Sequence, residues 1–379
     1  MTNPFTMRVI PPDGPFCNRV QELKDLRQHG VNRANVVVFS PRRYGKTSLA
    51  KRVQSGLEGE GFLACYTDLF MVTGVEEVAR RIARTVYAVL HRRESLLEKG
   101  ARFLKTFATF RPVFKPSVQD GFTLSVEPVS PALPGIEALD KVLEELGLFI
   151  ERETPKLHFV LDEFQEITEL KDPSIEGIFR KHIQHQPASY CFVGSRRRVL
   201  LDMFNQRSRP FYQSAIMYPL KALPLAELSA FLQERFAAEG KTCPPAVAQV
   251  ISQRTGRHPY YAQALAYNTF DLAARQIRPE DVDAGFERLL AAERYAFEAM
   301  VQGLTGPQIS LLRALAASPT AKILSSDYIA SHKLTIGGVQ YAQKKLLELD
   351  LIEKKDDIWQ VVDPVFAVWL SRYGTGGFP

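Results

Sequence analysis

Residues 36–48 read Val36-Val37-Val38-Phe39-Ser40-Pro41-Arg42-Arg43-Tyr44-Gly45-Lys46-Thr47-Ser48. The β-branched run at the start predicts a strand, and the stretch from Lys46 onward is compatible with a helix. Between them, Ser40 to Thr47 matches the spacing G-x-x-x-x-G-K-[ST] of a phosphate-binding P-loop, with serine in place of the first glycine. A strand, a glycine-containing turn and a helix in this order begin an α/β unit. The stretch therefore predicts a P-loop on a parallel α/β sheet.

The loop residues predict a site for ATP and Mg²⁺. Backbone N–H groups of such a loop cradle the phosphates at the N-terminus of the following helix. Gly45 lets the backbone approach closely, Lys46 neutralises charge between the β- and γ-phosphates, and the Thr47 hydroxyl ligates Mg²⁺. The predicted nucleotide-binding residues of the loop are Ser40, Pro41, Arg42, Arg43, Tyr44, Gly45, Lys46, Thr47 and Ser48. A chance turn is the alternative, but the strand and the helix that flank the loop argue against it.

A second motif follows downstream and reads Leu157-His158-Phe159-Val160-Leu161-Asp162-Glu163. An apolar strand that ends in two acids delivers both carboxylates to the carboxyl edge of a parallel sheet, where ligands of open α/β sheets bind. Taken alone, Asp-Glu after an apolar strand marks only a strand end. Downstream of a P-loop, Asp162 is expected to hold Mg²⁺ and Glu163 to act as general base for ATP hydrolysis. The predicted catalytic residues are therefore Lys46, Asp162 and Glu163.

The remaining chain continues the alternation of strands and helices up to about residue 222. Further strands are expected at 62–68, 190–193 and 215–218, and amphipathic helices begin near Val75 and Ile136. A β-hairpin insertion is expected at 111–134, with Asp120-Gly121 as its turn. The sequence predicts a P-loop ATPase domain at 1–222, a helical lid at 223–300 and a winged helix-turn-helix at 301–379.

Five stretches, taken in chain order, match the motifs of one family. They are Pro15-Phe16-Cys17-Asn18-Arg19-Val20-Gln21-Glu22-Leu23, of the form F-x-x-R-x-x-E-L; Pro41-Arg42-Arg43-Tyr44-Gly45-Lys46-Thr47-Ser48-Leu49; Leu161-Asp162-Glu163-Phe164-Gln165; Gly256-Arg257-His258-Pro259-Tyr260-Tyr261; and Val362-Asp363-Pro364-Val365-Phe366-Ala367-Val368-Trp369-Leu370. On its own, each remote stretch would indicate core packing or a turn. In this order they span nearly the whole chain. The sequence resembles the archaeal-type ATPases within the AAA+/STAND class of P-loop NTPases.

The resemblance implies roles for residues outside the two acidic and phosphate-binding motifs. Phe16 to Arg19 are expected to line the adenine side of the pocket. Ser195 falls where such ATPases carry a polar sensor of the γ-phosphate, and His258 where STAND-type lids contact the nucleotide phosphates. Without the resemblance, His258 would fit a helix-capping or packing role better.

The chain departs from the family pattern at two places. Ser40 replaces the usual glycine, and because serine is small, nucleotide binding is expected to survive. The Gly-Arg pair that supplies an arginine finger in the family is missing from the segment before the last strand. Arg207 and Arg209 lie near this position; they are either substitutes for the finger or ordinary exposed loop arginines. A missing finger predicts slow turnover.

The C-terminal block reads as a winged helix-turn-helix. Three helices are expected at 307–317, 325–332 and 335–349, capped at Ser325 or Ser326 and at Thr335, followed by a charged hairpin and a strand at 358–362. Helix 335–349 would enter a major groove of double-stranded DNA. However, residues 301–379 hold 8 Lys and Arg against 7 Asp and Glu, whereas residues 1–120 hold 20 against 11. Since phosphate contacts dominate DNA affinity, a protein partner or self-association remains an equal alternative.

A basic face at Arg80, Arg81 and Arg84 is either a source of attraction for DNA or a solvated helix face.

Composition limits the class of protein. The chain has 379 residues, of which 45% are apolar and 24% are charged, as in soluble globular proteins. No apolar run approaches the 18 or more residues that cross a bilayer, and four scattered cysteines suit a reducing compartment, so a cytoplasmic protein without a membrane partner is expected. The predicted function is a Mg²⁺-dependent ATP hydrolase that switches with its nucleotide and is coupled to DNA. The rivals are a slow-turnover signalling scaffold and a catalytically inactive binder. A GTPase is disfavoured because no N-K-x-D motif occurs.

Overall fold

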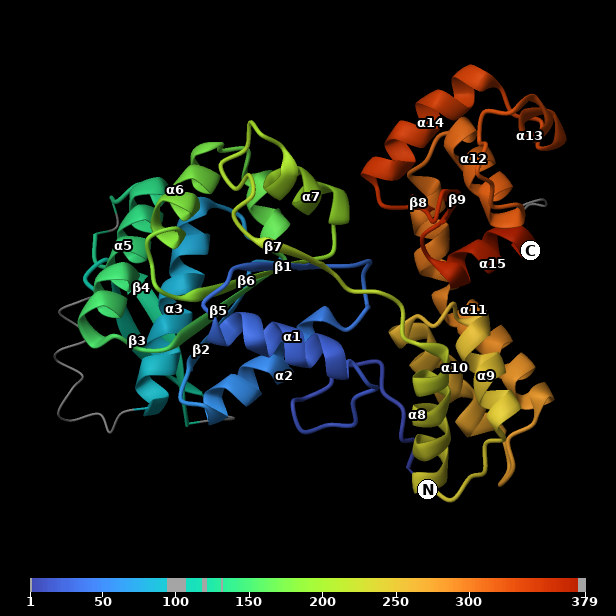
Figure 1. Ribbon diagram of the computed structural model, residues 1–379, viewed down its shortest axis with the longest axis horizontal. Coiled ribbons are helices and arrows are strands. Elements are labelled where there is room, and N and C mark those ends of the chain that lie inside the picture. Colours follow the sequence, from blue (N-terminus) through green and yellow to red (C-terminus); the bar gives the residue numbers. More distant parts are fainter. Residues whose placement is uncertain (1, 94–106, 118–120, 131, 374–379) are drawn as a thin grey trace.

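The computed structural model describes residues 2–93, 107–117, 121–130 and 132–373. Figure 1 shows the arrangement: the sheet and its helices lie on one side, and the helices of residues 225–302 and the C-terminal residues lie on the other.

Five parallel strands form the central sheet in the order β2-β5-β6-β1-β7. Their bounds are β1 Val36–Phe39, β2 Leu63–Asp68, β5 Leu157–Asp162, β6 Ser189–Gly194 and β7 Ile216–Pro219. The strand before the P-loop, β1, pairs with β6 and β7, and the strand that ends at Asp162 pairs with β2 and β6. The predicted parallel α/β fold is confirmed.

Helices cover both faces of this sheet (Figure 1). One face packs against α1 Val20–Val31 and α2 Lys46–Gly59; the other packs against α3 Val75–Arg93, α5 Gly135–Glu153, α6 Ser174–Ile183 and α7 Arg197–Asn205. The alternation of side chains along each strand divides the core. In β1, Val36 and Val38 join the α1 and α2 side, whereas Val37 joins the other. A short 3-10 helix, η1 Phe164–Leu170, follows β5 directly.

The predicted hairpin insertion is present as a separate two-stranded sheet. Strands β3 Phe110–Ser117 and β4 Gly121–Pro128 pair antiparallel. Phe110 and Val126 are buried in the core that the hairpin shares with α3 and α5. Asp120 of the expected turn lies outside the described residues.

A second group of helices follows the sheet. It consists of α8 Leu225–Ala238, α9 Pro245–Arg254, α10 Pro259–Leu272 and α11 Pro279–Gln302. The N-terminal segment joins this group to the sheet. Phe5 packs edge-on against Phe236 with ring centroids 4.8 Å apart, and the Ile10 backbone N–H donates to Ser48 Oγ at 3.0 Å. The segment therefore runs from the helical group to the first turns of α2.

The C-terminal residues form a winged helix. Its elements are α12 Gly306–Ala317, α13 Ser326–Ser331, α14 Ile336–Glu348, β8 Ile352–Lys355, β9 Ile358–Val361 and α15 Pro364–Tyr373. The predicted caps are confirmed, since Ser325 Oγ accepts from the Tyr328 backbone N–H and Thr335 Oγ1 from that of Gly338.

One continuous hydrophobic core extends from α8 to α15. At its junction the Phe297 ring of α11 lies 5.1 Å from that of Phe366 and 5.7 Å from that of Trp369, both on α15. Helix α11 runs across the expected boundary at residue 300, and the boundaries at 222 and 300 stay predictions. The shared core joins the winged helix to the helical group with apolar contacts.

The starts of helices α1 and α15 differ in the signals that the sequence carries for them. Helix α1 begins after Arg19, a non-glycine residue in the left-handed region with φ 66°, whose own side chain does not cap the helix. The Val20 backbone N–H instead donates to Asn18 Oδ1 at 3.2 Å, one position before the usual capping residue. Helix α15 is capped at the usual position, because Asp363 accepts from the backbone N–H groups of Val365 and Phe366, both at 2.9 Å.

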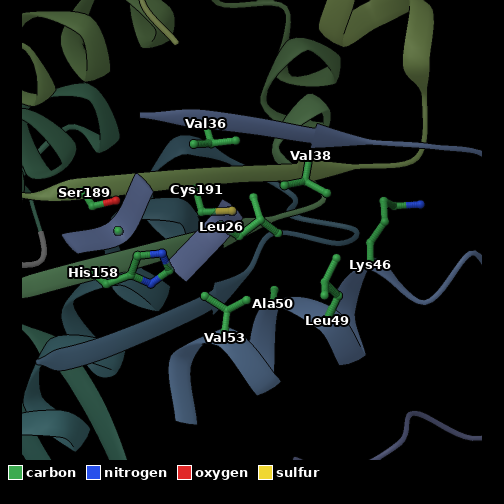
Figure 2. Close-up of a pocket in the computed structure, with 11 residues that line it drawn as sticks. Leu26, Val36, Val38, Lys46, Leu49, Ala50, Val53, His158, Ser189 and Cys191 are labelled. Carbon is green, nitrogen blue, oxygen red and sulfur yellow. The ribbon is translucent and has the colours of Figure 1, made fainter. Parts of the chain in front are cut away.

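A small internal cavity of about 10 Å³ lies between the sheet and the helices α1 and α2 (Figure 2). His158 of β5 lines it together with aliphatic side chains, Cys191 and Ser189. The His158 ring is buried, and its Nδ1 has no hydrogen-bond partner among the described residues. Burial lowers the pKa of His158 to about 4, so the ring is neutral at pH 7.

We predict that His158 makes the fold less stable in mild acid. Between the ordinary pKa near 6.5 and the folded value near 4, the unfolded chain binds a proton here that the folded chain does not. The free energy of unfolding therefore falls as the pH drops through this window, by at most about 3 kcal/mol, and the effect saturates below it. His158→Leu should reduce this slope without loss at pH 7.5, as measured by urea denaturation at each pH. Parallel pH profiles for both proteins would contradict the prediction.

Candidate functional site

The P-loop and the end of β5 meet at the carboxyl edge of the sheet, where they line a cavity of about 370 Å³. The predicted site residues that line it are Phe16, Arg19, Arg42, Arg43, Tyr44, Gly45, Lys46, Thr47, Ser48, Glu163 and Ser195. Four others do not line it but bond to residues that do; they are Ser40, Pro41, Asp162 and His258. The structure thus brings these residues to one edge of the sheet, whereas Asn18, which lies within the range expected on the adenine side, does not line the cavity.

The conformation of the loop requires the glycine at position 45. Gly45 has φ 82°, in the left-handed region, and it immediately precedes α2. Arg43 also has a positive φ of 62°. These turns leave the first N–H groups of α2 at the cavity, where a helix N-terminus favours anions.

Lys46 is a deeply buried cation of the cavity, with 6% of its surface exposed. Its Nζ donates to the carbonyl oxygens of Ser40 at 3.1 Å and Pro41 at 2.9 Å. Burial lowers the pKa of Lys46 to about 8, although the Glu163 and Asp162 carboxylates act in the opposite direction. A phosphate beside this ammonium would compensate its desolvation.

Asp162 is held by three donors. Its Oδ2 accepts from Thr47 Oγ1 at 2.7 Å and from Tyr66 Oη at 2.5 Å, and its Oδ1 accepts from the Glu163 backbone N–H at 2.9 Å. Tyr66 belongs to β2, which pairs with β5. Its hydroxyl fixes the rotamer of the carboxylate that faces Thr47.

The Glu163 side chain is fixed through one oxygen. Its Oε2 accepts from Ser195 Oγ at 2.9 Å and from Gln165 Nε2 at 2.5 Å. Ser195 follows β6 directly, so the neighbouring ends of β5 and β6 bring the two residues together. Glu163 lies in the left-handed region with φ 51°, a conformation that costs energy in a non-glycine residue.

Phe16 and Arg19, which are expected on the base side, also line the cavity. The Arg19 side chain is only 3% exposed; its Nη1 bonds to Glu22 at 2.7 Å, while Nη2 has no partner among the described residues. The Phe16 ring lies beneath the Arg52 guanidinium at 4.9 Å. Residues 6–10 of the N-terminal segment also line the cavity.

His258 lies behind the loop instead of in the cavity. Its Nε2 bonds to the Arg42 carbonyl oxygen at 3.2 Å, and its ring packs between those of Tyr44 at 4.5 Å and Tyr261 at 4.7 Å. Burial lowers the pKa of His258 to about 3, so the ring is neutral and donates through Nε2–H. The next residues, Pro259 and Tyr260, do line the cavity.

Arg43 links the loop to the helical group. Its guanidinium lies over the Tyr260 ring at 4.1 Å and bonds to Glu293 at 3.3 Å. The Tyr260 hydroxyl donates to the same Glu293 oxygen at 2.7 Å. The helical group is therefore connected to the P-loop by polar and ring contacts of Arg43 and His258.

Polar groups also join the winged helix to the site. Arg197, at the start of α7 and two residues after Ser195, bonds to Glu353 of β8 at 2.5 Å and to Asp350 at 3.5 Å. Asp363, which precedes α15, accepts from the Tyr261 hydroxyl at 2.5 Å. No local pattern predicts the Arg197 contacts, because Arg197 and Glu353 lie 156 residues apart.

The arginines proposed as substitute fingers differ. Arg209 bonds to Glu176, a buried residue of α6, so it is occupied within the chain. Arg207 is exposed and makes no ion pair with any residue that the structure describes. On the predicted basic face, Arg80 pairs with Glu76 at 2.6 Å and Arg81 with Glu77 at 2.5 Å, which neutralises much of it.

The donor set beside the loop fits Mg²⁺. Thr47 and Asp162 present a hydroxyl and a carboxylate oxygen 2.7 Å apart. Mg²⁺ is commonly bound through one or two carboxylates together with substrate phosphates and water. Within the described ranges, no three His, Cys, Asp or Glu side chains cluster as a metal site of their own.

Comparison with known proteins shows the same architecture. A family described as a probable winged helix domain matches residues 295–372. A Walker-type ATPase of Pyrococcus abyssi is similar with a TM-score of 0.67 and 17% identity, covering 97% of this chain and 99% of the other. The Aeropyrum pernix ORC2 protein, in ADPNP and ADP complexes, is similar at 0.59 and 17%, with 97% and 95% covered. The Aeropyrum pernix ORC1 protein in complex with DNA is similar at 0.51 and 14%, with 98% of each chain covered.

At these identities the likeness establishes a common fold. The expected P-loop ATPase sheet with a C-terminal winged helix is confirmed. No curated protein sequence matches the chain. Among the described helices, none is both long and apolar enough to span a membrane.

We predict that Arg209→Ala destabilises the fold. It would leave the buried Glu176 carboxylate without its partner, which costs about 1–3 kcal/mol. The measurement is the free energy of unfolding in urea, with the exposed Arg207→Ala as matched control, expected to change by less than about 0.5 kcal/mol. Equal stabilities of both variants and the wild type would show that Arg209 has no structural role.

Proposed function

We propose that this protein binds ATP with Mg²⁺ in the P-loop cavity and hydrolyses it, and that the nucleotide state controls how the winged helix is presented to double-stranded DNA. ATP binding is supported best by one observation: four polar residues line the same cavity, namely Lys46, Thr47, Glu163 and Ser195. They come from the ends of three strands of one parallel sheet.

Two buried cationic groups support a bound nucleotide. Lys46 Nζ bonds only to neutral oxygen atoms among its hydrogen-bond partners, and Arg19 Nη2 has no partner in the described chain. Buried donors of this kind are costly unless a ligand satisfies them. In the proposal, Lys46 faces the β- and γ-phosphates, and Phe16 and Arg19 hold the base.

Glu163 carries the chemical step in this proposal. One of its oxygens is fixed by Ser195 and Gln165, which leaves Oε1 to accept a proton from the attacking water. The water oxygen bonds to the γ-phosphorus as the bond to the β–γ bridging oxygen breaks, giving ADP and phosphate. Thr47 and Asp162 would hold Mg²⁺, which supplies charge neutralisation at the phosphates.

The contacts around the cavity suggest how the switch works. The helical group and the winged helix share one apolar core, so we expect them to move together. Their contacts with the loop and with α7 are polar, through His258, Arg43 and Arg197. A ligand that moves the loop or the Ser195 turn would bias these contacts, and this is what a nucleotide switch requires.

DNA is the proposed partner of the winged helix. Helix α14 exposes Gln340 and Lys344, and a protein of the same fold, the Aeropyrum pernix ORC1 protein, is known in complex with DNA. A protein partner is the second candidate. It is favoured by the exposed Ile336 and Tyr341 on the same helix, at 58% and 63% exposure.

We predict that Lys46→Ala weakens ATP binding about 10- to 100-fold, because a charge-assisted contact to phosphate is lost. Glu163→Gln should retain ATP binding and lower the hydrolysis rate by about two to four orders of magnitude. Fluorescent-nucleotide titration and phosphate release measure the two effects. The exposed Lys141→Ala on α5 is the matched control. Undiminished phosphate release by Glu163→Gln would remove it as the base.

We predict that Arg197→Ala uncouples the winged helix from the nucleotide. In the wild type, binding to labelled duplex DNA should differ between ADP and a non-hydrolysable ATP analogue, and should weaken steeply with salt. Without the bonds from Arg197 to Glu353 and Asp350, this difference should shrink while ATP affinity stays within about twofold. Fluorescence anisotropy over a salt series measures it.

The control for this experiment is Arg198→Ala, the exposed neighbour on α7, which should keep the nucleotide dependence. Lys46→Ala should abolish it. If no DNA binds even at low salt, the DNA part of the proposal is wrong and the protein-binding candidate takes its place.

A further inference from the structure

We infer that Gln165 is a positioning residue for ATP hydrolysis: its side-chain amide, together with Ser195, holds the Glu163 carboxylate so that the free oxygen faces the attacking water. This inference rests on the proposed role of Glu163 as the base. It assigns Gln165 a function that its position in a buried 3-10 helix does not suggest by itself.

The contact is direct and buried. Gln165 is 1% exposed, and its Nε2 lies 2.5 Å from Glu163 Oε2. Ser195 Oγ donates to the same oxygen at 2.9 Å. Two donors on one oxygen restrict rotation of the carboxylate about its last bond. The other oxygen, Oε1, receives no hydrogen bond from the described residues.

The orientation of the Gln165 amide follows from chemistry. A carboxylate only accepts hydrogen bonds, so the NH₂ group must face Glu163 and the amide oxygen must face the other way. This amide oxygen, Oε1, is buried and has no hydrogen-bond partner in the described chain. An unpaired buried oxygen lowers stability, so an aliphatic side chain would suit the core better. The hydrogen bond that the amide NH₂ group donates to Glu163 explains why glutamine occupies this position.

Gly194 provides the space for this arrangement. A Cβ at Gly194 would lie 2.0 Å from Gln165 Oε1 and 2.8 Å from Leu200 Cδ1. Gly194 has an ordinary strand conformation, so backbone freedom does not require glycine there. Close approach of the Gln165 amide does require it. The end of β6 therefore supplies both the Ser195 hydroxyl and the gap for Gln165.

The backbone does not hold Glu163 in this orientation unaided. Glu163 lies at φ 51° between β5 and η1, so its side chain leaves the strand direction. Gln165 is anchored within η1, where its carbonyl oxygen accepts from Thr168 Oγ1 at 2.8 Å. The rigid 3-10 turn thus places the amide, and the amide places the carboxylate.

The test compares Gln165→Leu with a matched buried glutamine. Gln186 also buries its amide, which donates to the Leu143 carbonyl oxygen at 2.8 Å, but it lies away from the cavity. In Gln165→Leu we expect single-turnover hydrolysis to slow about tenfold or more, with ATP affinity within twofold of the wild type. Gln186→Leu should lower thermal stability and leave the hydrolysis rate within twofold.

A second variant displaces the amide without removing it. Gly194→Ala should slow hydrolysis to a similar extent, because its methyl group pushes Gln165 away from Glu163. When Gly194→Ala is added to Gln165→Leu, the double variant should hydrolyse ATP less than about twofold more slowly than Gln165→Leu alone. This non-additivity distinguishes displacement of Gln165 from general damage to β6.

The outcomes separate this inference from the proposed function. If the wild type hydrolyses ATP, Glu163→Gln does not, and Gln165→Leu matches the wild type, the inference alone is wrong. Additive effects of Gly194→Ala and Gln165→Leu would also overturn it. If the wild type binds ATP without hydrolysing it, the proposed hydrolysis fails and the role of Gln165 fails with it.

Discussion

The hydrogen bond from Thr47 Oγ1 to Asp162 Oδ2 joins the two motifs on which the site depends, across 115 positions of sequence. It forms because β1 and β5 are parallel neighbours of the same strand, β6, so all their carboxyl ends reach one edge. The register is close: Phe39 pairs with Gly194, and Leu161 with Phe192. Ser195 therefore emerges beside Glu163, and the P-loop begins beside both. The cavity is a consequence of the strand order.

Two kinds of contact hold the rest of the molecule around this edge. The helical group and the winged helix are joined by apolar rings such as Phe297, Phe366 and Trp369, whose separation would expose a large hydrophobic area. Against the loop and α7 they make a few polar and ring contacts, through His258, Arg43 and Arg197. Polar contacts at a partly exposed interface are exchanged for water at small net cost. We therefore expect the helical group and the winged helix to move as one body relative to the sheet.

The sequence was sufficient for the strands, the P-loop and the acidic pair, because each has a local pattern of β-branched residues, glycine or charge. It was also sufficient for the winged helix, in which Ser325 and Thr335 cap their helices as predicted. It did not reveal Tyr66 or Arg197, since their partners depend on strand order and on docking between distant segments. The contact of Gln165 with Glu163, two residues away, depends on the local 3-10 turn, which the sequence pattern did not predict. It placed His258 among the nucleotide-binding residues, whereas the structure places its ring behind Arg42 and the following Pro259 and Tyr260 in the cavity. The residue at which α10 begins decides which of these adjacent residues faces the cavity. Hydrophobic periodicity does not locate the start of a helix to one residue.

Burial also separates the roles of the polar groups around the cavity. His258 is neutral because burial lowers its pKa to about 3, so it brings no charge to a phosphate and acts by holding the Arg42 carbonyl oxygen. Gln165 and Tyr66 are neutral as well, and each fixes one acid, Glu163 or Asp162. Charge for a ligand comes instead from Lys46, whose burial makes a bound anion especially favourable. A neutral buried frame around a few charged groups would keep those groups fixed when a charged ligand binds or leaves, so that little reorganisation would accompany the proposed hydrolysis.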